Sequence, residues 1–457
     1  MVATLTSYDG GVVSNPQRLV RPQSIDEIQA ILRDPAQFPS PVRAMGSFHS
    51  LTPCAASPGT IVDMSGLRQV QRIDRESMTM TAQAGLQSID AAAALRASGL
   101  QFRLNPEIGN MTLGSAACCH SKDSLGAVEY GQASSYLTVM KWVSPGGELR
   151  EASDEDEPAL LEILRSSYGL GGILHEVTFR IQPLQKVRFE YELLHLSELR
   201  QEAISEAIAA NESLVFWTLG RTVVMQTRNQ ASTARNEWIP GLRRLFWSRL
   251  GATMARGLAV TRGTPLGGVT DALWPLAEQV PYRTLSALGG FSLYEPDKMI
   301  DYRRTPSSGR YAFTFWAFPR DEWVANLRAY VEFSEEHQRQ FGFRCNLPLG
   351  SYFIRHDTSS LLSYSHEGDI ISIDPIHAPT RRDRPGWDRF LRAFNEWAAA
   401  RGGIPLLNQS PHVTRAQVSA AYGPRWQQFS QWVAEADPER RMLNPFFAEL
   451  LGEPAQA

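Results

Sequence analysis

Short runs of helically spaced or alternating hydrophobic residues fill the first third of the chain. Residues 24–32 place hydrophobic side chains at helical spacing behind Ser24, with acids in the first turn, and predict a capped helix. Residues 77–85 alternate hydrophobic and polar side chains up to a glycine, which predicts a half-buried strand. Residues 88–99 are rich in alanine and end at a glycine, which predicts a second helix. This pattern is typical of an α/β unit built from short elements.

The second part of the chain combines alternating runs with longer helices. Residues 187–194 and 214–225 alternate hydrophobic and polar side chains and predict strands, and further strands are expected at residues 311–319, 354–364 and 369–374. Helices are expected at residues 197–212, with Ser197 as the cap, and at residues 322–341 and 390–401. Strands and helices in this order predict an antiparallel sheet covered by helices, so the expected fold class of the whole chain is α+β.

Composition and charge restrict the function classes. The chain has 457 residues, 43% of them hydrophobic and 20% charged, which fits a folded protein of two or three domains. A formal net charge of −3 argues against a general nucleic-acid binder. No run approaches eighteen hydrophobic residues and the first residues lack a signal-peptide pattern, so we expect no membrane span and a cytoplasmic location.

Neither the cysteines nor the clustered acids predict a metal site. Four cysteines do not make a disulfide scaffold in a chain of this length, and the adjacent Cys118 and Cys119 lack the spacing of a zinc site. We interpret these two as small buried hydrophobic residues. The acids of residues 154–157 precede a helical pattern, where they complement the dipole of a helix N-terminus.

Three glycine-bearing segments lie between these elements. Residues 42–50, Val-Arg-Ala-Met-Gly-Ser-Phe-His-Ser, read as a short strand and a turn that presents His49. Residues 105–124 are rich in small side chains, and residues 169–183 run from a Gly-Leu-Gly-Gly turn into a strand. Small residues allow the close backbone approach and the N–H contacts that a diphosphate needs.

In this order and at these distances, the three segments resemble the flavin-binding (PCMH-type) domain of the vanillyl-alcohol oxidase family. They are most similar to its aldonolactone and alditol oxidases and its decaprenylphosphoryl-ribose oxidases. In the covalently flavinylated branches a histidine in Gly-x-x-His-Ser carries the FAD, and His49 stands at that position. The resemblance implies an FAD-binding domain over residues 1–183. It implies attachment through His49 alone, because the Cys-Pro step of doubly attached relatives reads Asn105-Pro106 here.

The resemblance also implies which residues contact FAD. They are small side chains, glycines and their neighbours in the three segments: Gly46, Ser47, Phe48, His49, Ser50, Gly109, Thr112, Gly114, Ser115, Ala116, Gly172 and Ile173. Flavin supplies the hydride acceptor, so the chain has to supply binding, orientation and proton transfer.

The C-terminal segment carries the second part of the resemblance. Residues 402–410, Gly-Gly-Ile-Pro-Leu-Leu-Asn-Gln-Ser, match the Gly-Gly-x-Pro-His-Trp-Gly-Lys segment of aldonolactone oxidases, and residues 422–447 are similar to their tail. The resemblance implies a substrate or cap domain over residues 184–457, whose last part, residues 402–457, returns toward the flavin.

The sequence departs from the resembled family where a sugar would be held. The glutamate of the family's Glu-Trp-Ala-Ile-Pro strand falls at Phe315, its Glu-x-Arg pair falls near Gly350 and Tyr352, and a lysine near the flavin falls at Gln409. Because hydroxyl recognition needs buried donors and acceptors, these replacements predict a larger and less polar substrate.

Polar and aromatic side chains of both halves supply the candidates for the site. A base or hydrogen-bond partner for the substrate is expected among His120, Lys122, Tyr352, His366 and Gln409. Substrate contacts are expected from Phe315, Tyr352, Tyr364 and Asn408.

Three functions stay open on the sequence. The favoured one is an FAD-dependent oxidase or dehydrogenase that takes hydride from a hydroxyl or activated C–H bond of a largely apolar small molecule. A specialised-metabolite intermediate would fit, including a hydroxy acid that loses CO2 after oxidation. The second is a polar alcohol or aldonolactone oxidase with a rearranged site, and the third is a flavin-binding protein without turnover. Oxygen or another acceptor would take the electrons.

Residues 235–262 stand apart because six arginines accompany a single glutamate. Hydrophobic residues recur every four positions in this segment: Leu242, Phe246, Leu250, Met254 and Leu258. One interpretation is an interfacial helix that contacts a membrane surface or an apolar carrier. The pattern favours the other, an amphipathic cap helix with a solvated basic face.

Overall fold

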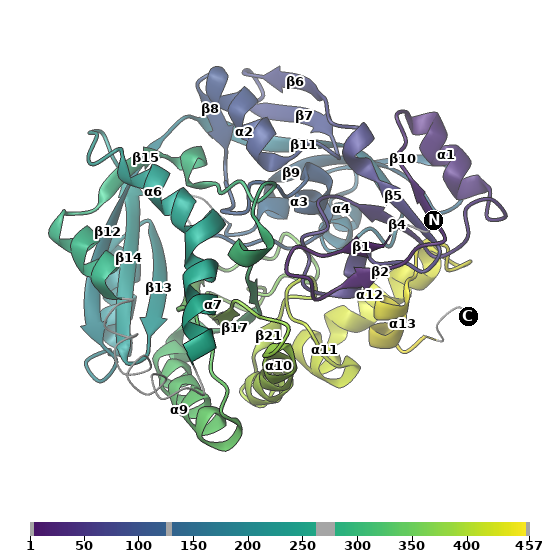
Figure 1. Ribbon diagram of the computed structural model, residues 1–457. Coiled ribbons are helices and arrows are strands. Elements are labelled where there is room, and N and C mark those ends of the chain that lie inside the picture. The colour runs from purple at the N-terminus through teal and green to yellow at the C-terminus, as the bar shows by residue number, and fades with distance from the viewer. Residues whose placement is uncertain (1–3, 125–129, 262–278, 454–457) are drawn as a thin grey trace.

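The computed structural model describes residues 4–124, 130–261 and 279–453, with the side chains of residues 258–261 left out. Figure 1 shows two sheet regions, one from the purple and blue first part of the chain and one from its teal and green second part. The helices are packed around both. Within the described residues, no helix is both long and apolar enough to cross a membrane.

Two sheets form the first part. A parallel sheet has the order β3 (Arg18–Val20), β5 (Thr60–Asp63), β4 (Val42–Met45). An antiparallel sheet has the order β10 (Leu149–Ser153), β9 (Leu137–Val143), β11 (Ile173–Pro183), β7 (Thr79–Gln83), β6 (Val70–Asp74), and β8 (Leu100–Phe102) pairs with β11. The helices that pack on these strands are α1 (Ile25–Arg33), α2 (Ser88–Ala97), α3 (Leu113–Cys118) and α4 (Pro158–Leu164).

Local sequence signals explain several of these elements. The Ser24 hydroxyl accepts a hydrogen bond from the Glu27 N–H at 3.2 Å and caps α1, as the sequence predicts. In β7 the alternation also holds, since Met80 and Ala82 are buried and their neighbours are partly exposed. The predicted helix at residues 88–99 is α2, which is followed by Gly99 at φ +69°.

One antiparallel sheet of eight strands forms the second part. Its order is β15 (Phe291–Tyr294), β12 (Lys186–His195), β14 (Thr222–Gln230), β13 (Ser213–Leu219), β18 (Leu349–Ile354), β19 (Ile370–Ile373), β17 (Trp316–Pro319), β21 (Ile404–Pro405). This sheet and the helices beside it confirm the expected α+β class. In the central strand β13 the alternation directs Phe216 to one face and Trp217 to the other.

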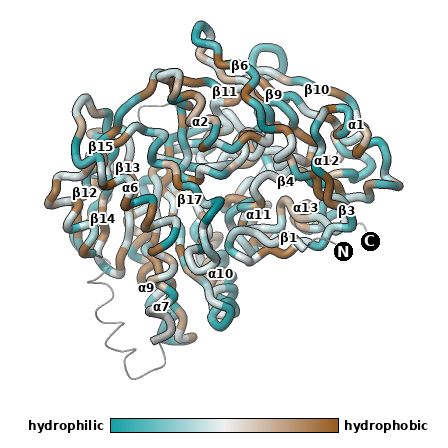
Figure 2. Tube along the Cα trace, turned by 45° about the horizontal axis from the view of Figure 1, so that its top comes forward, coloured by the Kyte–Doolittle hydropathy of each residue, from teal (hydrophilic) through white to brown (hydrophobic). Residues whose placement is uncertain are grey.

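Different helices cover the two faces of this sheet. The Phe216 face packs in one hydrophobic core with α5 (Gln201–Ala210), α9 (Trp323–Phe341) and α10 (Arg384–Ala399). The Trp217 face meets α6 (Ile239–Leu245) and α7 (Gly251–Thr261), which a π-helical turn, Phe246–Leu250, connects. This second face also borders the site described below. Hydrophobic stretches run along the inner strands, while the loop beside β6 is hydrophilic (Figure 2).

The C-terminal helices return to the first strands of the chain. These are α11 (Arg415–Tyr422), α12 (Pro424–Ala436) and α13 (Pro445–Leu451), and Figure 1 shows α12 and α13 in yellow beside the purple strands. The Arg43 side chain, on β4 and only 3% exposed, joins the two ends. It donates hydrogen bonds to four carbonyl oxygens, those of Cys54, Tyr168, Gly169 and Met442.

Four sequence predictions in the second part are wrong in detail. The strand predicted at 214–225 is two strands, because β13 ends at Leu219 and β14 begins at Thr222. Ser197 does not cap α5, which begins at Gln201 without a side-chain cap. The strand predicted at 311–319 is interrupted, leaving β16 (Ala312–Phe313) and β17. The strand predicted at 354–364 is a loop after Ile354. There the N–H of Leu362 donates to the Ser166 hydroxyl, so a side chain replaces a strand partner.

The favoured interpretation of residues 235–262 is only partly right: α6 and α7 cover the sheet and Arg235 and Arg249 are exposed, but the other described arginines are only partly exposed. Arginines of this segment turn inward and donate to backbone carbonyls: Arg243 to Lys298, Arg244 to Asp297, and Arg256 to Pro379, Ser307, Ser308 and Arg310. Hydrophobic side chains point outward instead, with Leu242, Leu250 and Met254 being 54%, 45% and 50% exposed. Arginine binds carbonyl oxygens with several N–H donors at once, and this outweighs the helical pattern here. Arg262 and the side chain of Leu258 lie outside the described part.

We predict that Arg43→Met lowers the free energy of unfolding by about 3 kcal/mol or more, because buried carbonyl oxygens lose their donors. Chemical denaturation of the purified protein measures this change. The matched control is Arg18→Met on the exposed side of β3, which should alter stability by less than about 0.5 kcal/mol. Equal stability of the two variants would contradict the role given to Arg43.

Candidate active site

Two cavities meet between the first part of the chain and the Trp217 face of the second sheet. The larger, here called the main cavity, holds about 1060 Å³ of space, including its opening to solvent. The smaller, here called the aromatic chamber, holds about 770 Å³ on the same measure. They share four lining residues, Ile108, Met111, Phe313 and Gln409. A ligand in the main cavity would therefore border the chamber at these residues.

Glycines allow the loops to close around the main cavity. A Cβ on Gly46 would lie 2.5 Å from Thr112 Oγ1, and a Cβ on Gly172 would lie 2.1 Å from the Val143 carbonyl oxygen. Gly172 also has φ +135°, a conformation that L side chains rarely adopt. Any larger residue would push the loops apart, so glycine is required at both positions.

His49 stands in the wall of the main cavity on a strained turn. Phe48, directly before it, has φ +50°, which is uncommon for a bulky residue and typical of functional sites. The imidazole ring stacks on Tyr8, with ring centroids 4.2 Å apart and an angle of 17° between the planes. Burial lowers the pKa of His49 to about 4, so the ring is neutral at physiological pH.

Three residues that line the main cavity each have a buried polar atom without a hydrogen-bond partner in the described part of the chain. His49 Nε2, Asn408 Oδ1 and Gln409 Oε1 are buried, and none has a hydrogen-bond partner among the described residues. Buried polar groups without partners are rare in folded proteins. With the glycine-lined loops and the size of the cavity, they fit a flavin nucleotide.

Aromatic side chains dominate the chamber. They come from the sheet, from the helical segment over it and from the loop that follows β15: Trp217, Trp247, Tyr302, Tyr311, Phe313 and Tyr352. The hydroxyl groups of Tyr302 and Tyr311 are 2.7 Å apart and hydrogen-bond each other. The walls are therefore apolar rings with few free polar atoms.

A buried ion pair interrupts this aromatic lining. Lys122 Nζ contacts Asp374 Oδ2, and the two side chains are 10% and 2% exposed. Burial lowers the pKa of Lys122, while Asp374 raises it. Burial raises the pKa of Asp374 to about 6, while Lys122 and the nearby Ser372 hydroxyl lower it. The ammonium group lies 4.1 Å from the ring centroid of Phe315 and 4.8 Å from that of Tyr352.

The structure brings most of the FAD-contact candidates together. Nine of them line the main cavity: Gly46, Ser47, Phe48, His49, Ser50, Thr112, Gly114, Ser115 and Gly172. The other three do not. The N–H of Gly109 donates to the Ile300 carbonyl, while Ala116 and Ile173 are buried in hydrophobic cores.

Some of the catalytic and substrate candidates line one of the two cavities, and others line neither. Lys122, Tyr352 and Gln409 line the chamber, and Asn408 lines the main cavity. The other four, His120, Phe315, Tyr364 and His366, line neither cavity.

Local contacts account for each of these four positions. His120 is fully buried with Nε2 2.8 Å from the Ser360 hydroxyl, and burial lowers its pKa to about 3. Phe315 lies behind Lys122, and the Tyr364 hydroxyl donates to the Ser121 carbonyl. His366 is on a surface loop, 3.0 Å from Glu367.

Three residues near the site were missed by sequence reasoning. Asp374 directly follows the hydrophobic strand β19, and an acid at that point was a usable signal. Glu107 lines the chamber, although it was visible only as part of a glycine-rich segment. Tyr8 stacks on His49 from a position 41 residues earlier in the chain, and no local pattern indicates this contact.

Comparison with known proteins identifies the families of the two parts of the chain. A family model described as FAD binding domain matches residues 16–153, and a model described as D-arabinono-1,4-lactone oxidase matches residues 177–450. L-gulono-1,4-lactone dehydrogenase of Mycobacterium tuberculosis is 23% identical over 451 residues, covering 98% of this chain and 99% of the relative. L-gulonolactone oxidase of Scyliorhinus torazame is 20% identical and covers 94% of both chains.

Solved structures with the same fold are also found. A solvent-stable cholesterol oxidase is 16% identical with a TM-score of 0.75, covering 98% of this chain and 97% of the other. A cholesterol oxidase from B. sterolicum is 15% identical with a TM-score of 0.76, covering 99% and 97%. These likenesses show the fold, and the family matches show the chemistry class. The chain is an FAD-dependent oxidoreductase of the vanillyl-alcohol oxidase type and belongs to the D-arabinono-1,4-lactone oxidase family.

Proposed function

We propose that the protein oxidises a hydroxyl group of a small molecule whose body lies in the aromatic chamber. The observation that carries this proposal is the buried Lys122–Asp374 pair in the chamber wall, beside the residues that the chamber shares with the main cavity. A buried acid with a raised pKa next to a cofactor cavity is a typical arrangement for proton transfer.

The first part of the chain would hold FAD in the main cavity. Residues 46–50, Thr112, Gly114, Ser115 and Gly172 would surround it, with Asn408 and Gln409 closing the cavity from the C-terminal segment. When bound, FAD supplies the hydride acceptor. In this proposal residues 1–183 form the FAD-binding domain and residues 184–457 the substrate domain.

Asp374 would take the proton that the substrate hydroxyl loses. An alcohol that gives up hydride from its carbon becomes a carbonyl compound once its O–H proton is also removed. Asp374 Oδ2 is held by Lys122, while Oδ1 has no hydrogen bond of standard geometry among the described residues. In this proposal Lys122 orients the carboxylate, and Oδ1, which is buried here, would accept the proton of the substrate hydroxyl.

We infer that FAD is attached covalently to His49. A neutral imidazole has the lone pair that forms a nitrogen–carbon bond, and burial keeps this ring neutral. Tyr8 restricts the orientation of the ring by stacking on it. Nε2 has no hydrogen bond to break before it reacts, which supports this nitrogen as the point of attachment.

The aromatic walls support an alcohol with an apolar body as the substrate. Six aromatic side chains line the chamber, and an apolar body would bury its surface against them. The second candidate is an aldonolactone, because a full-length relative is named L-gulono-1,4-lactone dehydrogenase. The charged residues in the chamber wall, Lys122, Asp374 and Glu107, give this alternative its physical support.

Anaerobic mixing with candidate substrates tests the proposal. Benzyl alcohol and 1-phenylethanol represent apolar alcohols, and L-gulono-1,4-lactone and xylitol represent polar ones. We expect the apolar alcohols to bleach the flavin absorbance faster. Faster bleaching by the lactone would favour the second candidate. No bleaching by either class, with FAD bound, would contradict an enzyme of either kind.

We predict that His49→Ala abolishes covalent flavin. The wild-type polypeptide should fluoresce under ultraviolet light after denaturing electrophoresis, whereas the variant should release all its FAD on acid denaturation. His175→Ala is the matched control, since His175 is also largely buried but lines neither cavity. Free flavin released from the wild-type protein would overturn the covalent assignment.

We also predict a pH dependence of substrate-driven flavin reduction. The rate should rise as pH increases through about 6, because Asp374 accepts a proton only when it is ionised and burial raises its pKa to about 6. Asp374→Asn should lower the rate by roughly 10²–10⁴-fold and remove this rise. Stopped-flow measurements of anaerobic reduction from about pH 5 to about pH 8, on both sides of the raised pKa of Asp374, check both statements.

Asp388→Asn is the control for this experiment. Asp388 lies on α10 with a side chain that is 41% exposed, and it lines neither cavity. Its substitution should leave the pH profile unchanged. A profile that still rises near pH 6 in Asp374→Asn would assign the base to another group.

A further inference from the structure

A second charged group lies in the wall of the aromatic chamber. Glu107 follows Pro106 in the segment between β8 and α3, and its side chain is 17% exposed. Proton transfer from the reacting hydroxyl does not require it. A carboxylate in a wall of aromatic rings is costly to bury unless it has a function or is fully bonded.

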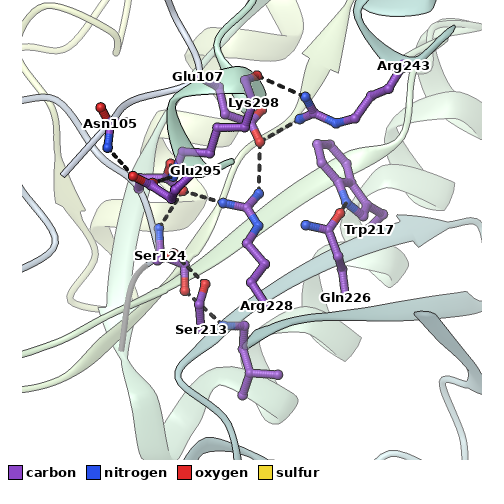
Figure 3. Close-up of polar contacts among 12 residues, drawn as sticks. Asn105, Glu107, Ser124, Ser213, Trp217, Gln226, Arg228, Arg243, Glu295 and Lys298 are labelled. Carbon is purple, nitrogen blue, oxygen red and sulfur yellow. Dashed lines mark hydrogen bonds and ion pairs between the residues drawn. The ribbon is translucent and has the colours of Figure 1, made fainter. Parts of the chain in front are cut away.

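The two oxygens of Glu107 differ. Oε1 accepts hydrogen bonds from Arg228 Nη2 at 2.8 Å and from Arg243 Nη2 at 2.6 Å (Figure 3). Oε2 receives no hydrogen bond from any of the residues that the structure describes. The carboxylate is therefore fixed in place through one oxygen, and the other retains its capacity to accept.

Each of the two arginines that bind Glu107 also donates a hydrogen bond to a second acceptor. Arg228 Nη1 donates to Asp123 at 2.7 Å, and Arg243 Nη1 donates to the Lys298 carbonyl at 3.1 Å. Lys298 Nζ lies 2.5 Å from both Asp123 and Glu295. The group contains three acids (Glu107, Asp123, Glu295) and three bases (Arg228, Arg243, Lys298). Its charges therefore cancel, and it offers no net charge to attract an ionised ligand. The free oxygen is suited to a neutral donor.

Tyr352 adjoins both charged groups of the chamber. Its ring centroid is 4.8 Å from Lys122 Nζ. Burial raises the pKa of its phenol most, and Glu107 is the first charged group that adds to this. A ligand that lies along Tyr352 therefore has the Lys122–Asp374 pair and Glu107 within the same cavity.

We propose that Glu107 Oε2 is a second substrate anchor that accepts a hydrogen bond from a hydroxyl group other than the one being oxidised. The substrate class is a diol, or an alcohol with a second neutral donor, whose two polar groups are joined by an apolar body. The inference rests on the proposed function, because it places the reacting hydroxyl at Asp374. Such a substrate would pack its apolar body against the aromatic walls and would also have a second hydroxyl group to be recognised, as the names of the lactone-oxidising relatives suggest for polar substrates.

Three tertiary alcohols test the anchor without turnover. They lack the C–H bond that gives hydride, so they bind but are not oxidised. The probes are 2-phenylpropan-2-ol, its analogue with a second 2-hydroxypropan-2-yl group in the para position, and the methyl ether of that second hydroxyl. Perturbation of the flavin absorbance of the FAD-loaded protein, titrated with each probe, gives the dissociation constants.

In the wild-type protein the diol should bind at least about tenfold more tightly than the mono-alcohol, because hydrogen bonds to charged groups are strong. The ether has no donor at the second position and should show no such gain. Glu107→Ala should remove the preference for the diol. Glu107→Gln keeps the shape of the side chain but points an NH2 group into the chamber, so it should make the ether bind as well as the diol.

Glu295→Gln is the matched control. Glu295 belongs to the same charged group, contacting Lys298 and Asn105, but it does not line the chamber. It should keep the wild-type preference for the diol. Equal loss of that preference in Glu295→Gln and Glu107→Ala would show that the charged group only supports the fold, and would overturn the proposal.

The remaining outcomes separate this inference from the proposed function. A mono-alcohol that binds while the diol binds no better overturns the anchor alone. Failure of all three probes to bind overturns both, because the chamber would then not accept aromatic alcohols.

Discussion

The buried charges around Arg228 hold the two parts of the molecule in register. Asp123 and Glu107 belong to the segment between β8 and β9, whereas Arg228 and Lys298 belong to the second part of the chain. Removing one partner of a buried ion pair typically costs about 3–5 kcal/mol, because a charge is left uncompensated in the interior. The same segment contributes Ile108, Met111 and Lys122 to the cavity walls. The walls of both cavities therefore depend on these buried ion pairs between the two parts of the chain.

The aromatic chamber bears on two conflicting interpretations of the substrate, one apolar and one polar. Replacement of the family's sugar-binding residues predicted an apolar substrate. Aromatic side chains line the chamber, but the family match and the named relatives do not support that prediction. The relatives named for lactone oxidation point to polar recognition, and Lys122, Asp374 and Glu107 supply charged groups from other positions. The comparison of motifs predicted a site without polar groups, but the chamber contains these three charged side chains. They come from other strands and loops than the family's sugar-binding residues.

Local signals in the sequence predicted the elements that local physics determines. The helix behind Ser24 and the alternating strand at 79–83 could be predicted from their own residues. The resemblance to the flavin-binding family could be recognised from the order and spacing of three segments. Contacts between distant residues were beyond this reasoning. The segment after Ile354 was predicted as a strand, yet it is a loop whose Leu362 N–H donates to Ser166, almost 200 residues earlier in the chain. Asp374 and Lys122 meet for the same reason, by tertiary folding that no local period records.

The return of the C-terminal segment to the first strands has a consequence for how the holoprotein is made. Asn408 and Gln409 line the main cavity, and the Met442 carbonyl occupies one of the donors of Arg43. During synthesis, the N-terminal part leaves the ribosome long before these residues exist, so the nascent chain presents only an incomplete cavity. The cavity is therefore complete only after residues 408–442 have been synthesised and have folded back onto the first strands.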